Sequence, residues 1–307
     1  MFRSSHVYRA VFALFVLAAV LGLATSASAQ RDFSDVEIKA EKVTEGIYML
    51  TGAGGNIGVS VGDDGVLMID DQFAPLTEKI TAAIKEISDK PIRFVLNTHY
   101  HGDHTGGNEN LGKAGVLIVA HDNVRKAMSV DKFLKMLGAE SPASPKEALP
   151  VVTFNDSVTF HLNGETIHAY HVPPSHTDGD SLVHFQNANV LHMGDTFFNG
   201  IFPFIDTDNG GSVAGMIANG EATLKKINDD TKIIPGHGPL ASKKELAAFV
   251  DMLKQVQAAV EPHVKAGKTM DEIVAMDPLA EIAKVWGKGF LNAEVFTKIA
   301  VDGMMKN

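Results

Sequence analysis

One short segment of the sequence carries four side chains that can bind metal ions. Residues 98–104 read Thr-His-Tyr-His-Gly-Asp-His and begin two positions after residues 92–96, a mostly apolar run that predicts a buried strand. In an extended chain residues two apart point the same way, so His99 and His101 converge, while a bend at Gly102 turns the next two side chains towards a second position. Burying these groups together without a cation would leave charge and hydrogen-bond donors unpaired, so the run predicts metal binding. The two residues after the bend are Asp103 and His104.

Three further ligand candidates lie in separate segments, and each follows or ends an expected strand. They are His176 in Pro-Ser-His-Thr-Asp-Gly-Asp, Asp195 in Gly-Asp-Thr, and His237 in Pro-Gly-His-Gly. Because the chain has no cysteine, imidazole and carboxylate are the ligands that remain, and both suit Zn²⁺. The other histidines lack this setting and are interpreted as structural: His121, His161, His168, His171, His184, His192 and His263.

Several carboxylates near these motifs are candidates for orienting the imidazoles. Asp70 and Asp71 end an expected strand, and Asp178 and Asp180 follow His176 closely. A ligand imidazole usually donates its other N–H to a carboxylate or carbonyl, and these acids are placed to accept it. The alternative is turn chemistry, because Asp is frequent at strand ends and in Asp-Gly turns.

The segment that follows Asp195 is rich in aromatic residues. Residues 196–204 hold four Phe, more than a soluble loop exposes without a reason. They either line an apolar substrate pocket or belong to the core, and both interpretations stay open. Upstream, the glycine-rich residues 52–55 are either a mobile flap or a plain turn.

The order of the ligand motifs resembles the metallo-β-lactamase superfamily of binuclear zinc hydrolases. The resemblance covers nearly the whole chain after its first 29 residues and fills every expected ligand position. It implies an α/β fold, a four-layer αβ/βα sandwich in which two mixed sheets pack between helices. It also implies two Zn²⁺ ions, the first held by His99, His101 and His176, and the second by Asp103, His104 and His237, with Asp195 bridging.

Two positions depart from the β-lactamases of this superfamily. The resemblance gives Asp195 the bridging carboxylate of thioesterases and lactonases, where β-lactamases usually have Cys or Ser. Phe198 stands where many β-lactamases carry a Lys that holds the drug carboxylate, and the candidates for that contact here are the neighbouring Asn199 or a backbone N–H. We therefore expect modest affinity for the carboxylate of a β-lactam drug and a broad substrate range.

The mechanism follows from two adjacent cations. Cations about 3.5–4 Å apart lower the pKa of a shared water from about 15.7 towards about 7, which makes hydroxide available to attack a carbonyl. Asp103 is expected to orient this nucleophile as the catalytic carboxylate. The leading substrate is a β-lactam, and the alternative is a thioester or lactone, as in glyoxalase II. An alternative of another class is a non-catalytic metal-binding or redox module.

Composition excludes several other classes of protein. Lys and Arg total 27 against 37 Asp and Glu, a formal charge of −10, which argues against nucleic-acid binding. With 45% hydrophobic and 21% charged residues the chain buries a sizeable core, and without cysteine it is no disulfide scaffold. The expected partner is a small-molecule substrate.

The first 29 residues predict a secretory signal peptide. Arg3 and Arg9 precede the apolar residues 10–24, and Ala-Ser-Ala at 27–29 supplies a cleavage site. The apolar run is shorter than the roughly 20 residues that span a bilayer. We expect residues 30–307 to form a single domain in the periplasm or outside the cell, with no membrane attachment. The sequence gives no oligomeric state.

The remaining pattern predicts the elements that position the motifs. A strand at 66–69, a helix at 76–87 and a strand at 92–96 form a βαβ unit, whose edge is where open α/β sheets place their sites. Asn163-Gly164 predicts a hairpin. The other expected strands are 47–50, 57–61, 158–162, 166–172, 182–185, 190–193 and 232–234. The other expected helices are 213–227 and a capped helix after Ser242 that Pro262 kinks or ends. Two more short helices are expected in 278–305, packed through Trp286 and Phe290.

Overall fold

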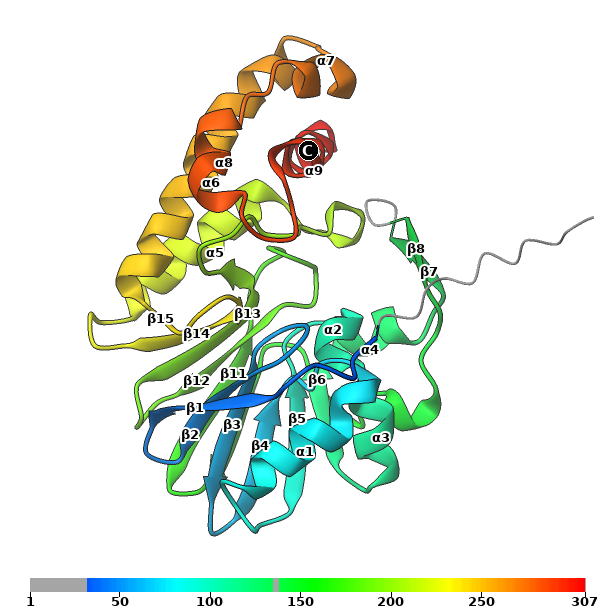
Figure 1. Cartoon of the computed structure of the whole chain (residues 1–307), viewed down its shortest axis with the longest axis vertical. Coiled ribbons are helices and arrows are strands. Elements are labelled where there is room, and N and C mark those ends of the chain that lie inside the picture. Colours follow the sequence, from blue (N-terminus) through cyan, green and yellow to red (C-terminus); the bar gives the residue numbers. More distant parts are fainter. Residues whose placement is uncertain (1–31, 135–137, 307) are drawn as a thin grey trace, which may run out of the picture. The chain divides into compact units, whose positions relative to one another are not determined.

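The computed structural model describes residues 32–134 and 138–306. The predicted signal peptide, residues 1–29, lies outside them. From Phe33 onward the chain forms one compact unit in which two mixed sheets face each other and helices cover their outer faces (Figure 1). This arrangement confirms the predicted αβ/βα sandwich. Within the described ranges, no helix has the length and apolar character needed to cross a bilayer.

The first sheet has seven strands in the order β1-β2-β3-β4-β5-β6-β9. The first four strands form an antiparallel meander, and from β4 onward the strands are parallel because the helix α1 crosses between β4 and β5. This crossing is the predicted βαβ unit. The strands are β1 (Lys39–Thr44), β2 (Ile47–Thr51), β3 (Ile57–Gly62), β4 (Gly65–Ile69), β5 (Ile92–Asn97), β6 (Leu117–His121) and β9 (Val152–Phe154).

The second sheet has six strands in the order β10-β11-β12-β13-β14-β15. All neighbours are antiparallel except β13 and β14, which run parallel. The predicted hairpin joins β10 to β11, with positive φ at Asn163 (58°) and Gly164 (70°), the conformation for which Asn-Gly is favoured. The strands are β10 (Ser157–Leu162), β11 (Glu165–His171), β12 (Ser181–Phe185), β13 (Val190–Phe198), β14 (Lys232–His237) and β15 (Ala241–Ser242).

Helices and a separate small hairpin complete the unit. The hairpin consists of β7 (Lys132–Leu134) and β8 (Ala139–Ser141). In the described part of the chain, single turns of 3₁₀-helix are η1 (Ala74–Leu76), η2 (Lys146–Ala148) and η3 (Thr207–Asn209). The α-helices are α1 (Thr77–Lys85), α2 (Gly102–Thr105), α3 (Asn108–Lys113), α4 (Asp122–Met128), α5 (Val213–Lys226), α6 (Lys243–Lys265), α7 (Met270–Ala275), α8 (Ala280–Trp286) and α9 (Ala293–Met305).

Apolar side chains fill the three spaces between the four layers. Leu67 and Leu96 of the first sheet meet Val183 and Phe185 of the second, and all four are fully buried. The helix α1 packs Ile80 onto the outer face of the first sheet. The helices α5 and α6 cover the outer face of the second sheet, and α9 packs against α5 and α6 (Figure 1). Because both sheets are buried on two faces in the middle, the polar ligand motifs collect where their strands end.

The helix α6 shows why its sequence folds as predicted. The Ser242 side chain accepts from the Lys244 N–H, and the Glu245 carboxylate accepts from the Ser242 N–H (3.0 Å), which satisfies amides at the helix start. The helix ends at Lys265, one turn after Pro262. Its predicted apolar stripe is buried: Leu246, Phe249, Val250, Leu253, Val256 and Val260.

Three expectations need correction. The strand β13 continues to Phe198, so Asp195 lies within a strand rather than after one, because parallel pairing with β14 continues past it. The helix α7 was not expected, although a capping box of Thr269 and Glu272 starts it. Phe290 is no packing anchor, since 60% of it is exposed, whereas Trp286 is half-buried against the core around α6.

Candidate metal centre

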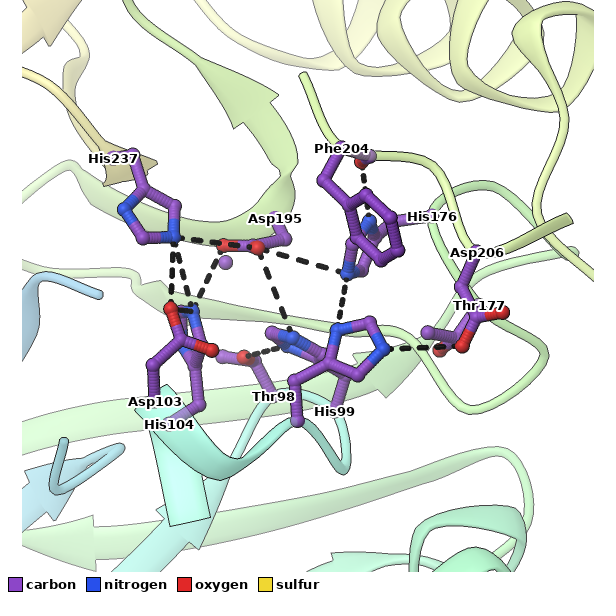
Figure 2. A network of polar contacts seen from close by, with 12 residues as sticks. Thr98, His99, Asp103, His104, His176, Thr177, Asp195, Phe204, Asp206 and His237 are labelled. Atoms are coloured by element: carbon purple, nitrogen blue, oxygen red, sulfur yellow. Dashed lines mark hydrogen bonds and ion pairs between the residues drawn. The ribbon is translucent and has the colours of Figure 1, made fainter. Parts of the chain in front are cut away.

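The two sheets bring all seven predicted ligands to one place. At the end of the first sheet, Ile69 pairs with Leu96, so the chain leaves β4 and β5 side by side. His99 and His101 follow β5, and the helix α2 begins directly afterwards with His101 as its N-cap. The second sheet supplies the loop before β12, the middle of β13 and the end of β14. Figure 2 shows the resulting cluster.

The ligand atoms divide into two groups. Within each group the nitrogens and carboxylate oxygens lie within 4.8 Å of one another. The resemblance implied the same split of the other six residues and gave Asp195 as the bridge between them. The first group is His99, His101, His176 and Asp195, all buried, and the second is Asp103, His104 and His237.

Asp195 lies between the two groups. Its Oδ1 is 3.0 Å from His104 Nε2 and its Oδ2 is 3.4 Å from His237 Nε2, both in the second group. The same Oδ2 is 3.6 Å from His176 Nε2 and 3.8 Å from His99 Nε2 in the first group. A carboxylate in this position can serve a cation on either side of it. In the second group, Asp103 Oδ2 lies 3.3 Å from His237 Nε2.

Partners outside the cluster fix the rings of the ligand histidines. Asp70 accepts from His104 Nδ1 (2.8 Å) and also from the Thr98 hydroxyl (2.8 Å) and N–H (2.7 Å). The Thr98 oxygen in turn lies 3.0 Å from His99 Nδ1. These contacts aim the other ring nitrogen of each histidine inward. Asp70 is thus in hydrogen-bond contact with the ring of His104.

Asp206 is an outer partner that no motif of the sequence predicted. It lies after β13 and accepts from His101 Nε2 (3.1 Å) and from the Tyr100 hydroxyl. The Phe204 carbonyl accepts from His176 Nδ1 (2.8 Å), so the same segment holds two ligand rings. The available signal was weak: Asp206 is the first acid after an apolar run, a setting that also fits an ordinary loop.

The ring nitrogens that face inward show that the donor set fits a metal. Because His176 donates through Nδ1 and His101 through Nε2, their inner nitrogens carry lone pairs, and these face each other at 2.9 Å. Two lone pairs at this distance repel unless positive charge lies between them. His99 Nε2 is buried without any hydrogen-bond partner. Imidazole nitrogens and carboxylates without sulfur are ligands that Zn²⁺ accepts.

The electrostatics of the cluster also favour positive charge. Burial lowers the pKa of His237, but the Asp195 and Asp103 carboxylates outweigh burial and raise it to about 9. Burial opposes ionisation of Asp103, yet His104 and His237 hold its pKa at about 2. Burial, followed by the neighbouring His104, lowers the pKa of His99 well below its usual range. A cation bound here would therefore compete with protons on His104 and His237.

Other residues expected near the site support the chain rather than the rings. Asp71 accepts from the Gly107 N–H (2.9 Å), which places it on backbone. Asp180 accepts from the backbone N–H groups of His176 (2.7 Å) and Thr177 (2.9 Å), so it shapes the turn that carries His176. Burial raises the pKa of Asp180 to about 7. The expectation that Asp71 and Asp180 accept from an imidazole is thus corrected.

Phe198 and Asn199 both act on His237. The Phe198 ring is fully buried and stacks on the His237 ring, with centroids 4.9 Å apart and 16° between the planes. Asn199 donates from its backbone N–H to the His237 carbonyl (2.8 Å) and from its side chain to the Pro239 carbonyl (2.9 Å). Its amide is therefore engaged with the loop and not with the cluster. All four Phe of residues 196–204 are buried, which favours a core role for them.

Two glycines allow the backbone to approach the ligands closely. A Cβ at Gly55 would lie 2.0 Å from Cε1 of His104, and a Cβ at Gly236 would lie 2.0 Å from Oδ1 of Asp195. The Gly55 N–H donates to the Asp103 carbonyl (3.1 Å), so this glycine holds the α2 segment by its backbone. The glycine-rich residues 52–55 thus form a wall of the cluster.

Comparison with known proteins gives one family. The family model of the metallo-beta-lactamase superfamily matches residues 50–238. Hydroxyacylglutathione hydrolase from a Polaromonas species is 29% identical over 164 residues, 53% of this chain and 55% of that protein. Metallo-beta-lactamase type 2 from a Bacillus species is 23% identical over 196 residues, 62% of this chain and 69% of that protein.

Solved structures share the fold. A metallo-beta-lactamase from Pontibacter korlensis superposes with a TM-score of 0.57 at 18% identity, and the superposition covers 71% of this chain and 99% of that one. The chain spans little more than half the length of the first of these curated relatives.

Proposed function

The chain belongs to the metallo-beta-lactamase superfamily, and from this premise we propose that it is an exported hydrolase that uses two Zn²⁺ ions to open an activated carbonyl. The observation that carries the proposal is the position of Asp195, whose two oxygens lie against both groups of ligand nitrogens. A single cation would leave one of these groups without a partner. When bound, two zinc ions supply Lewis acidity and bring the pKa of water near neutral.

The ligand groups of the proposed site differ in how open they are to substrate. The side chains of Asp103 and His237 are 27% and 16% exposed, whereas those of the other five ligands are 8% exposed or less. Substrate therefore approaches from the side of Asp103 and His237. With its pKa near 2, Asp103 stays ionised at neutral pH and accepts a hydrogen bond from the attacking water, which orients a lone pair towards the carbonyl.

The outer partners keep the cluster in one geometry. Asp70, Asp206 and the Phe204 carbonyl each fix a ring, so the ligands do not reorganise during the reaction. Phe198 stacks on the His237 ring, and Phe204 packs edge-on against the His176 ring. These two aromatic rings limit the access of bulk water to the parts of the histidine rings that they cover.

The first substrate to test is a β-lactam amide. Its strained carbonyl needs no group on the protein beyond the features just described, and the predicted export places the enzyme where such compounds occur. Thioester or lactone hydrolysis is the second candidate, because the shared ligand is a carboxylate, Asp195, and one relative is a hydroxyacylglutathione hydrolase.

A substrate panel tests the proposal. The metal content of the chain is measured as purified. The chain is then loaded with zinc and given a chromogenic cephalosporin, an acyl lactone, a thioester and a phosphodiester, each with and without a chelator. We expect about two zinc ions per chain and chelator-sensitive cleavage of one carbonyl substrate. Iron in place of zinc, together with no cleavage of any substrate, would instead support a redox module. Cleavage of the lactone or thioester without the cephalosporin would select the second candidate.

Export has its own test. Expression of the full chain with a C-terminal tag, followed by cell fractionation and sequencing of the N-terminus, should place the protein outside the cytoplasm with a start near Gln30. A protein that keeps its first residues and stays in the cytoplasm would contradict export but would leave the proposed hydrolase activity unaffected.

A further inference from the structure

Phe290 is an exposed aromatic residue at the open side of the ligand cluster. It lies between α8 and α9, and its ring centroid is 6.0 Å from that of His237 and 6.3 Å from that of Phe198. The planes of the His237 and Phe198 rings are tilted by 54° and 46° to that of Phe290, so neither ring stacks in parallel on it. Its 60% exposure is high for a large apolar side chain.

The backbone around Phe290 is fixed, so its exposure is not a consequence of a loose loop. The Trp286 carbonyl accepts from the Phe202 N–H (2.9 Å), and Leu291 is buried in the core beside α6 and α9. Gly289 lies against Ile201, since a Cβ there would be 2.8 Å from the Ile201 Cβ. After the loop, Asn292 caps α9 by accepting from the Val295 N–H (2.9 Å).

The position of Phe290 coincides with the exposed edge of the cluster. His237 is one of the two ligands with the most exposed side chains, and Phe290 and Phe198 lie on the same histidine. A molecule that reaches the ligands beside His237 therefore meets an aromatic surface made by Phe290. An aromatic face favours apolar and aromatic groups, with which it packs edge-to-face or in offset stacks.

We propose that Phe290 is a specificity-determining residue that packs against an apolar, preferably aromatic, substituent of the substrate. The proposal rests on the proposed hydrolase function and deepens it: it selects activated acyl compounds with an aryl or alkyl group over compounds of the same reactivity without one. Phe290 does not take part in bond cleavage.

Two thioesters of the same thiol test the proposal through turnover. One carries a phenylacetyl group and the other an acetyl group. We expect Phe290→Ala to lower kcat/KM for the phenylacetyl compound about tenfold, mainly through KM, and to leave the acetyl compound within about twofold. Phe290→Leu should restore part of the loss. An equal loss on both substrates, or none on either, would overturn the proposal.

A matched variant controls for the loss of exposed apolar surface. Val285 on α8 belongs to the same C-terminal segment and is 61% exposed. Val285→Ala should not change the ratio of the two kcat/KM values, and all variants should melt within about 2 °C of the parent, since surface changes of this kind alter stability little. A Val285→Ala effect as large as that of Phe290→Ala would contradict a specific role for Phe290.

A binding measurement separates this inference from the hydrolase proposal. Trp286 is the single tryptophan of the chain and lies four residues before Phe290, so its fluorescence reports on this loop. Titrating the zinc-loaded protein with phenylacetate should change the fluorescence saturably, at least about tenfold more tightly than acetate, and Phe290→Ala should remove the difference. This result would support the role of Phe290 even where no substrate is cleaved. Phenylacetate binding that Phe290→Ala leaves unchanged, or no preference over acetate, would refute it.

Discussion

Two kinds of buried histidine occur among the described residues: His192 on β13, and the histidines of the ligand cluster. His192, three residues before Asp195, is fully buried, donates from Nε2 to the Asn56 carbonyl (3.2 Å) and accepts the Gly194 N–H at Nδ1 (3.2 Å). Both of its nitrogens are satisfied by protein. In the cluster, by contrast, His176 and His101 each give one nitrogen to an outer partner and turn the other towards each other.

Burial alone therefore does not mark a histidine as a metal ligand. His121 and His171 lie apart from the cluster and stack in parallel, with centroids 3.8 Å apart and 6° between their planes, and neither belongs to a group of metal-ligating residues found among the described residues. What distinguishes the ligands is an inner nitrogen without a protein hydrogen-bond donor, beside the carboxylate of Asp195. The following predictions test this distinction.

The largest effect is expected from His101→Ala, compared with His171→Ala. Removing His101 deletes an inner nitrogen, so we expect zinc content to fall from about two per chain towards one and kcat/KM to fall by about 1,000-fold or more. His171→Ala removes a stacked ring and should leave kcat/KM within about threefold. The measurements are metal analysis and turnover of the best substrate in the panel. Equal activity of the His101→Ala variant and the parent would show that the cluster is not the site of reaction.

The next effect concerns His192 and pH. Burial lowers the pKa of His192 to about 4, whereas an unfolded histidine titrates near 6.5. Between these pH values the unfolded state binds more protons than the folded state. His192 therefore leaves the free energy of unfolding unchanged above about pH 6.5 and lowers it as the pH drops towards 4, by on the order of 3 kcal/mol.

Urea unfolding of the parent and of His192→Gln, with chelator present at pH 7 and pH 4.5, measures this contribution. The difference in unfolding free energy between the two proteins should shrink as the pH falls. A difference that stays constant over this range would mean that His192 is not held neutral by burial.

A smaller effect is expected from Asp70→Asn. The Asp70 carboxylate accepts from Thr98 and from His104, and an amide has only one accepting oxygen, so its NH₂ group would face a donor. Zinc affinity should drop about 10- to 100-fold, measured by competition with a chelating indicator.

Asp71→Asn is the matched control for this substitution. Burial raises the pKa of Asp71 well above its usual range, and its contact is the Gly107 N–H. Because Asp71 does not touch a ligand ring, zinc affinity should change by less than about threefold. A loss at Asp71 equal to that at Asp70 would mean that buried charge, rather than ring orientation, sets the affinity.

The smallest effect is expected at the stacked pair. Burial and the neighbouring His171 lower the pKa of His121, so its folded form resists protonation and the pair is destabilised as the pH falls below about 6.5. NMR titration should give His121 a pKa below that of a free histidine, while His121→Gln should leave turnover within about twofold. A pKa above 6.5 would reveal a negative partner that the stack does not contain.

The parts of the fold that sequence predicted are those with local signals. The Asn163-Gly164 turn, the helix α1 behind Pro75 and the capping box at Ser242 each depend on residues a few positions apart. The continuation of β13 to Phe198 depends instead on pairing with β14, which is distant in sequence and leaves no local mark.

The candidate site divides in the same way. The seven predicted ligands stand in short motifs, so their residue types and spacing identify them from the sequence. Asp206, Thr98 and the Phe204 carbonyl orient rings through contacts that join different segments, and a backbone carbonyl carries no residue-type signal at all. Phe290 resembles a core residue in sequence, and only its place beside His237 shows otherwise.

The missing side chains at Gly55 and Gly236 also limit how this protein can change over generations. Any other residue at these positions would place its Cβ against the His104 ring or the Asp195 carboxylate. No single substitution of either glycine should therefore be tolerated. Laboratory evolution towards a new substrate should therefore accumulate its changes in the segment that joins α8 to α9 and leave both glycine codons untouched.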